Sequence, residues 1–171
     1  MAGAAKGGAR ELARRVLLRV RRDEAYATLA LAGELERVPE LPGPDRALAT
    51  ELCYGVLRRQ GQLDALLGAR LSRPLDKVDP DLLDILRLAA YQLLALDRVP
   101  AYAAVDEAVR AARRLRGQRA GGFVNAVLRR LERERSGQVP RTLEQLLEDL
   151  PAPGHPAAKL AREASLPLAL A

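Results

Sequence analysis

Apolar residues recur at three- and four-residue steps along most of the chain, a spacing that predicts amphipathic α-helices. In the segment 10–22, the apolar residues Ala13, Val16, Leu17 and Val20 share one face, and arginines fill most of the rest of the circumference. The segment is therefore predicted to be a helix with an arginine-rich face.

Proline and glycine mark the predicted ends of the other helices. The proline-rich stretch 39–44 is predicted to be a loop, and Gly61 is predicted to end a helix. Asp79 before Pro80 is a strong helix start, because an N-cap carboxylate precedes a proline in the first turn. The further predicted helices span 25–37, 44–61, 63–71, 80–96, 100–117, 123–133 and 143–150.

No strand-like alternation of useful length interrupts this pattern. Apolar residues make up 49% of the 171 residues but aromatic residues only 3%, so the core must consist of Leu, Ala and Val, which favour helices. The predicted fold class is all-α: a compact bundle of about seven helices with a proline-rich C-terminal tail.

The charge is unevenly distributed. The net charge of the chain is +6. Residues 1–22 carry seven cationic side chains and one carboxylate, and residues 110–135 carry nine cationic side chains and two carboxylates. Two basic helices could form one patch for a polyanion such as nucleic acid if their apolar faces share a core. The alternative is that the arginines are solvated and balanced elsewhere by Asp and Glu.

The segment 116–122 (RGQRAGG) is predicted to be a loop that leads into the last basic helix. Gly117 is predicted to be a left-handed helix cap, and Gly121 and Gly122 would let a phosphate approach the helix N-terminus. An ordinary helix cap explains the glycines almost as well. The segment is not a nucleotide-binding P-loop, since no strand precedes it and no Gly-Lys-Ser/Thr ends it.

Candidate chemistry is sparse. Cys53 lies within a predicted helix, and the one histidine, His155, lies in the proline-rich tail, so neither a Cys–His pair nor a zinc site is predicted. Asn125 is expected to bond to the backbone of a neighbouring segment, with base recognition as the alternative. The default role of all four tyrosines, which include Tyr26 and Tyr102, is core packing rather than stacking on bases.

Four segments, in order and with consistent spacing, resemble the NusB-like family. They are 51–59 (ELCYGVLRR), 86–94 (LRLAAYQLL), 98–109 (RVPAYAAVDEAV) and 122–130 (GFVNAVLRR). They look most like the N-terminal domain of RsmB-type ribosomal RNA cytosine-C5 methyltransferases. The resemblance implies an all-helical RNA-binding module, with ribosomal RNA as the expected partner.

In those methyltransferases the module precedes a Rossmann-like catalytic domain that uses S-adenosylmethionine and a cysteine nucleophile. No second cysteine or glycine-rich methyl-donor loop follows residue 135 here. The chain is therefore expected to bind no cofactor and to have no methyltransferase activity by itself. The alternative is a transcription antitermination factor of the NusB type, which binds RNA together with a ribosomal protein.

The resemblance and the charge pattern together yield a set of candidate RNA-binding residues. The arginine-rich N-terminal helix of NusB factors corresponds in charge and position to the first four. The set is Lys6, Arg10, Arg14, Arg15, Arg116, Arg119, Gly121 and Gly122.

The predicted organisation has four parts. Residues 1–9 are expected to be a flexible N-terminus and 10–137 the RNA-binding domain. Residues 138–150 are expected to form a short extra helix, and 151–171 a linker toward an absent catalytic domain. With one cysteine, no signal peptide and no membrane-length apolar stretch, the chain is expected to be cytoplasmic and to lack a membrane partner.

Overall fold

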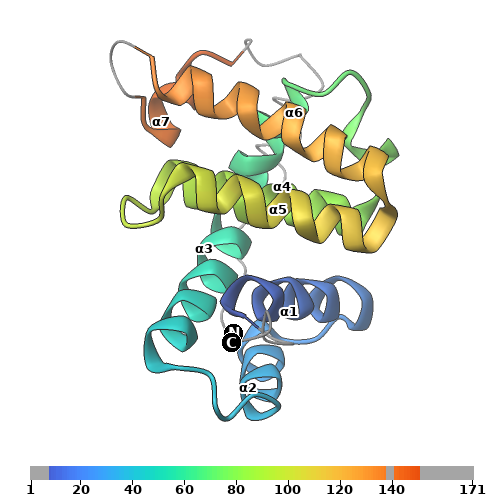
Figure 1. Ribbon diagram of the computed structural model, residues 1–171, viewed down its shortest axis with the longest axis vertical. Coiled ribbons are helices and arrows are strands. Elements are labelled where there is room, and N and C mark those ends of the chain that lie inside the picture. Colours follow the sequence, from blue (N-terminus) through green and yellow to red (C-terminus); the bar gives the residue numbers. More distant parts are fainter. Residues whose placement is uncertain (1–7, 138–140, 151–171) are drawn as a thin grey trace. The chain divides into compact units, whose positions relative to one another are not determined.

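The computed structural model describes residues 8–137 and 141–150, and every regular element within them is a helix (Figure 1). The predicted all-α class is thus confirmed. The predicted linker 151–171 and most of the predicted flexible N-terminus lie outside the described residues. The elements are α1 (Ala9–Asp23), α2 (Ala27–Glu36), α3 (Gly43–Gly68), the 3-10 helix η1 (Leu75–Lys77), α4 (Pro80–Ala95), α5 (Ala101–Arg116), α6 (Gln118–Arg135) and α7 (Leu143–Glu148).

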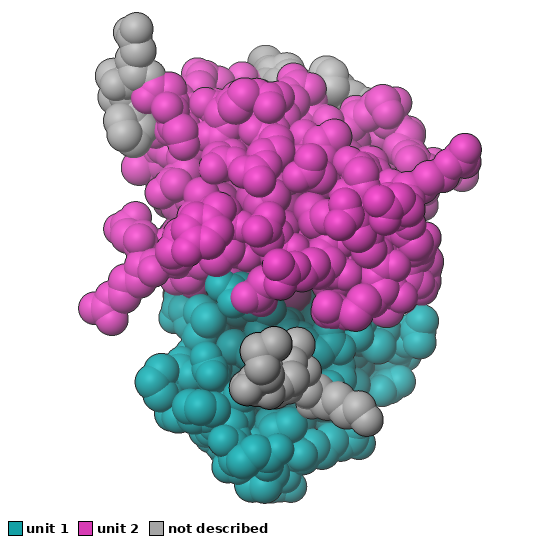
Figure 2. Space-filling model, in the orientation of Figure 1, with its two compact units in different colours: residues 1–57 teal, residues 58–171 magenta. Residues whose placement is uncertain are grey.

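The chain divides into two compact units, residues 1–57 and residues 58–171 (Figure 2). In the first unit, α1 packs against α2. The inner face of α1 is the predicted one, with Ala13 and Val16 fully buried and Leu17 4% exposed. Helix α1 ends where Glu24 adopts a left-handed conformation with φ of 51°.

Helix α3 is one continuous helix, so the predicted break at Gly61 is wrong. Gly61 is buried within the helix. A glycine in a helix interior costs only about 1 kcal/mol relative to alanine. The burial of Leu57, Leu63 and Leu66 along the same helix outweighs that cost.

Helix α4 is the core of the second unit, as its apolar sequence predicts. Every residue from 81 to 93 is buried, and both α5 and α6 pack on it. The predicted N-cap is confirmed, because the Asp79 side chain accepts a hydrogen bond of 2.8 Å from the Asp81 backbone N–H.

Helices α5 and α6 form a helical hairpin in which α6 returns along α5 (Figure 1). Two predictions fail here. The segment 116–122 is not a loop, since Gly117 alone separates the two helices. Gly117 is not a left-handed cap either: its φ of 86° is positive, but its ψ of −173° is extended. Glycine suits this single-residue joint because side-chain-bearing residues rarely adopt such a φ.

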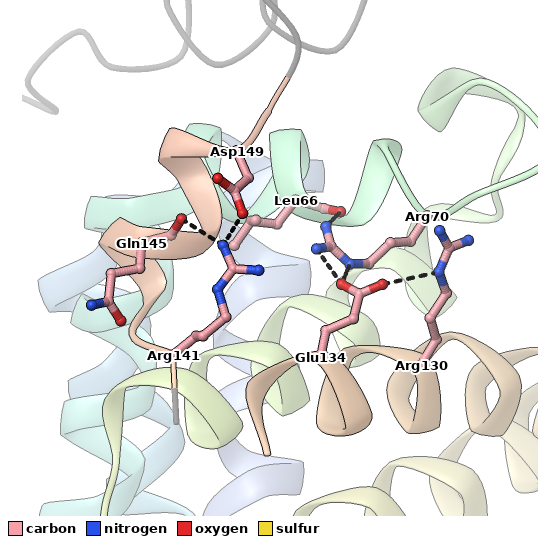
Figure 3. Close-up of polar contacts among 7 residues, drawn as sticks. All are labelled: Leu66, Arg70, Arg130, Glu134, Arg141, Gln145 and Asp149. Carbon is pink, nitrogen blue, oxygen red and sulfur yellow. Dashed lines mark hydrogen bonds and ion pairs between the residues drawn. The ribbon is translucent and has the colours of Figure 1, made fainter. Parts of the chain in front are cut away.

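Helix α7 begins with the predicted capping box between Thr142 and Gln145 and ends at Glu148, two residues before the predicted end. Arg141 bonds to the Gln145 carbonyl and pairs with Asp149 (Figure 3). Figure 3 also shows Glu134, which lies near the end of α6. Its carboxylate accepts hydrogen bonds from both Arg70 and Arg130.

Candidate nucleic-acid interface

Four exposed arginines gather where α5 meets α6 and form what we call the corner cluster: Arg110, Arg113, Arg114 and Arg119. Arg110 and Arg114 lie on the outer face of the last two turns of α5, Arg113 lies in the same turns with its stem against Gly121 of α6, and Arg119 lies in the first turn of α6. Within the described residues, no carboxylate pairs with these four guanidinium groups. Among these residues, no carboxylate competes with an anionic ligand for the four groups.

The start of α6 adds to this positive region. The first backbone N–H groups of a helix have no partner inside it, and they lie at the positive end of the helix dipole. No acidic residue occupies the first turn of α6. The groups belong to a helix rather than a loop, and the predicted phosphate contact stays a prediction.

The two candidate glycines of α6 differ in their surroundings. Gly121 is buried, and a Cβ atom there would lie 2.5 Å from Cγ of Arg113. Gly122 is exposed, and a Cβ atom there would meet nothing within 4 Å. Packing therefore explains the absence of a side chain at Gly121, whereas open space at Gly122 leaves room for a ligand.

Arg116 is engaged by two carboxylates at the start of α4. Its Nε donates to Asp79 at 2.7 Å and its Nη2 to Asp81 at 2.8 Å. Partial burial opposes ionisation of Asp79, but the hydrogen bonds from Arg116 and the Asp81 amide outweigh it, so the pKa of Asp79 lies below its usual 3.8. Arg116 thus ties the end of α5 to the start of α4, and its predicted RNA contact stays a prediction.

The candidate arginines of α1 are also engaged. Arg14 donates to both carboxylate oxygens of Glu11, at 2.9 and 2.8 Å. Arg10 is half-buried and is not a free cation. Lys6 lies outside the described residues. The predicted RNA-binding roles of these residues stay predictions, as does the convergence of α1 with the basic helices of the second unit.

Arg15 belongs to a buried ionic cluster around Glu34 of α2, whose side chain is only 2% exposed. Its Nε lies 3.0 Å from Glu34 Oε2, close enough for an ion pair but outside hydrogen-bond geometry. Arg19 and Arg37 approach the same carboxylate at 3.5 and 3.4 Å. Two arginines of α1, Arg15 and Arg19, therefore neutralise a carboxylate inside the first unit.

Three polar side chains lie elsewhere than predicted. Tyr26 and Tyr102 are 65% and 66% exposed rather than in the core. Asn125 is exposed on α6 rather than bonded within a buried run. Helical phase could not have placed Tyr102, because it lies three and seven residues before the buried Val105 and Val109, on the same side of α5.

Other chemistry is limited in the part of the chain that the structure describes. Cys53 is buried, and desolvation raises the pKa of its thiol to about 12, so it is a packing residue as predicted. No group of three or more His, Cys, Asp or Glu side chains among the described residues could hold a metal ion. None of the described helices combines the length and the apolar character needed to cross a bilayer.

Comparison with known proteins shows to which family the chain belongs. Residues 8–133 match the family model described as the NusB family. The chain is 42% identical over 125 residues to a probable ribosomal RNA small subunit methyltransferase B from Synechocystis, and 37% identical over 130 residues to its namesake from Bacillus subtilis. These matches cover 73% and 75% of the chain but only 28% of each relative.

A shorter relative and two solved structures carry the NusB name. The chain is 38% identical over 91 residues to the transcription antitermination protein NusB of Nitrosococcus oceani, covering 53% of the chain and 62% of that protein. A crystal structure of NusB and NusE in complex with dsRNA aligns with a TM-score of 0.68 at 22% identity, over 74% of this chain and 95% of that one. The structure of NusB from T. maritima aligns with a TM-score of 0.69 at 23% identity, and the alignment covers 76% of this chain and 92% of that one. At such identities the structures establish the fold.

Proposed function

Since the chain belongs to the NusB family, we propose that it is an RNA-binding domain of the kind found in ribosomal RNA small subunit methyltransferases B. In this role it holds ribosomal RNA and carries out no chemistry itself. The corner cluster is the observation that carries the proposal, because its four exposed guanidinium groups have no carboxylate partner among the described residues.

Charge pairing separates the corner cluster from the other arginines. Guanidinium groups bind phosphate well because their planar donors match its oxygens. Those of Arg14, Arg15 and Arg116 are already matched to carboxylates, so an RNA phosphate would have to displace them. Arg114 and Arg119 meet no such competition from the carboxylates that the structure describes, and we assign them the main phosphate contacts.

The methyl transfer itself belongs, in this proposal, to another part of the parent protein. The curated methyltransferases are three to four times longer than the portion that this chain matches. The methyl donor S-adenosylmethionine would bind to that other part, and this chain would bind no cofactor. Methylation of ribosomal RNA would place the protein in the cytoplasm.

A second candidate function is antitermination of transcription together with a ribosomal protein. The similarity to NusB of Nitrosococcus oceani favours it, as does the fold shared with NusB in complex with NusE. A factor of this kind would bind RNA tightly only when its protein partner is present. RNA binding measured with and without purified NusE distinguishes the two functions.

The test of the proposed function compares two double variants of equal charge. Arg114→Gln with Arg119→Gln removes two members of the corner cluster. Arg58→Gln with Arg98→Gln removes two exposed arginines outside it. Affinity for a small-subunit ribosomal RNA hairpin is measured across a salt series, and circular dichroism checks that both variants fold.

The expected result is weaker binding for the cluster variant only. Its plot of log affinity against log salt should be shallower by about 1.4 to 1.8, the contribution of two neutralised phosphates. Equal behaviour of the two variants, or no binding by the unaltered chain, would overturn the proposal.

A further inference from the structure

Tyr102 is the most exposed aromatic side chain in the described part of the chain. It is the second residue of α5, and 66% of its surface is accessible. A phenol ring left in water forgoes the favourable burial that drives core packing. The ring contributes little to the fold and is available to a ligand.

Tyr102 shares a helix face with Arg113 of the corner cluster. Eleven residues separate it from Arg113, close to three helical turns, so the two side chains project in nearly the same direction about 16 Å apart along the axis. Arg113 in turn lies against Gly121 of α6. This face of α5 therefore carries an aromatic ring at one end and the Arg113 guanidinium at the other, with Arg110 and Arg114 at neighbouring exposed positions.

Asp106 lies between them, one turn beyond Tyr102, and is also exposed. A carboxylate repels a phosphate, so the RNA backbone is disfavoured at this end of α5. The same carboxylate can accept a hydrogen bond from an amino group on the edge of a base. The N-terminal half of the helix thus suits a base, and the C-terminal half suits the backbone.

We propose that Tyr102 is a base-stacking residue, and that the exposed face of α5 binds a single-stranded segment of RNA. One unpaired base stacks on the Tyr102 ring beside Asp106, while neighbouring phosphates bind the corner cluster. This inference rests on the proposed function and adds the class of RNA: unpaired bases can turn out to stack on an aromatic ring, whereas the bases of a duplex cannot.

The test measures the affinity of Tyr102→Ala for two RNAs, a short unstructured oligonucleotide and a fully paired duplex. Tyr26→Ala is the matched control, since Tyr26 is 65% exposed, belongs to the first unit and makes no side-chain cap bond. Tyr102→Phe keeps the ring and removes the hydroxyl. Because both tyrosines are exposed, neither alanine variant should unfold.

The expected result is that Tyr102→Ala weakens binding of the single strand by about fivefold to 150-fold, the loss typical of one stacked base. Duplex binding should be unchanged, and Tyr26→Ala and Tyr102→Phe should bind like the unaltered chain. Equal losses on both RNAs, or no loss on either, would overturn the stacking role.

The double variant Arg114→Gln with Arg119→Gln separates this failure from failure of the proposed function. If it loses RNA binding while Tyr102→Ala binds normally, the stacking proposal is wrong and the RNA-binding function stands. If the unaltered chain binds neither RNA, both proposals fall.

Discussion

Arg113 of α5 lies directly against Gly121 of α6: a Cβ atom at position 121 would lie 2.5 Å from Cγ of Arg113 and 2.9 Å from its Nε. The contact holds together the hairpin that carries the corner cluster. It also limits how freely the Arg113 side chain can move, because its stem lies against the backbone of the neighbouring helix.

Gly121→Ala should be less stable than Gly122→Ala by about 1–3 kcal/mol in urea unfolding. Both changes gain helix propensity, but only the methyl group at 121 crowds Arg113. Equal stabilities would contradict the close approach. Gly122→Ala should leave the fold intact, so any loss of RNA affinity in that variant would report a phosphate close to the α6 backbone.

Asp64→Asn should lower the free energy of unfolding by about 3–5 kcal/mol, because it leaves the buried guanidinium of Arg87 without its main partner. Arg87 donates two hydrogen bonds to Asp64, at 2.7 and 2.8 Å, and a third to Asp84. Arg130→Gln is the control: its ion pair with Glu134 is largely exposed, and its loss should cost less than about 1 kcal/mol. Similar effects of the two changes would contradict a structural role for the Arg87 pair.

Glu34→Gln should destabilise the first unit by about 3–5 kcal/mol, since three guanidinium groups would lose the carboxylate that they share. Hydrogen exchange should accelerate first in α1 and α2, which the cluster connects. Glu36→Gln, at an exposed position of the same helix, should change little. Unchanged exchange in Glu34→Gln would contradict a structural role for the pairing of Glu34 with Arg15 and Arg19.

The Asp79–Arg116 contact should stabilise the fold in a pH-dependent way. Because the pKa of Asp79 is lowered in the folded state, its contribution is complete above the usual value of 3.8 and is lost as the pH falls through the lower folded value. An NMR titration of the Asp79 carboxyl should therefore have its midpoint below 3.8. Arg116→Gln should move that midpoint upward, and an unmoved midpoint would contradict the assigned cause.

The structure changes which arginines merit a functional test. Reversing the charge of Arg15 or Arg116 would place a new carboxylate beside Glu34 or beside Asp79 and Asp81. Lost RNA binding in such a variant would then reflect damage to the fold. Arg114 and Arg119 avoid this problem because neither pairs with a carboxylate in the described part of the chain.

The sequence by itself determined most of the helices and most of their inner faces. Burial repeats along a helix with the period of the backbone, so Val16 in α1 and Leu86 in α4 could be placed in the core without any tertiary information. Local signals also placed the caps at Asp79 and Thr142, since a cap depends on residues within one turn. Where local signals competed with burial, as at Gly61, burial prevailed.

Only the tertiary structure decided which charges are available. Arg116 meets Asp79 across 37 positions, Arg70 meets Glu134 across 64, and Arg15 meets Glu34 on another helix. Such pairings depend on how helices pack, and no repeat along the chain encodes them. Arg15 and Arg114 therefore look alike in the sequence, although the first neutralises a buried carboxylate and the second is exposed and pairs with no carboxylate among residues 8–137 and 141–150.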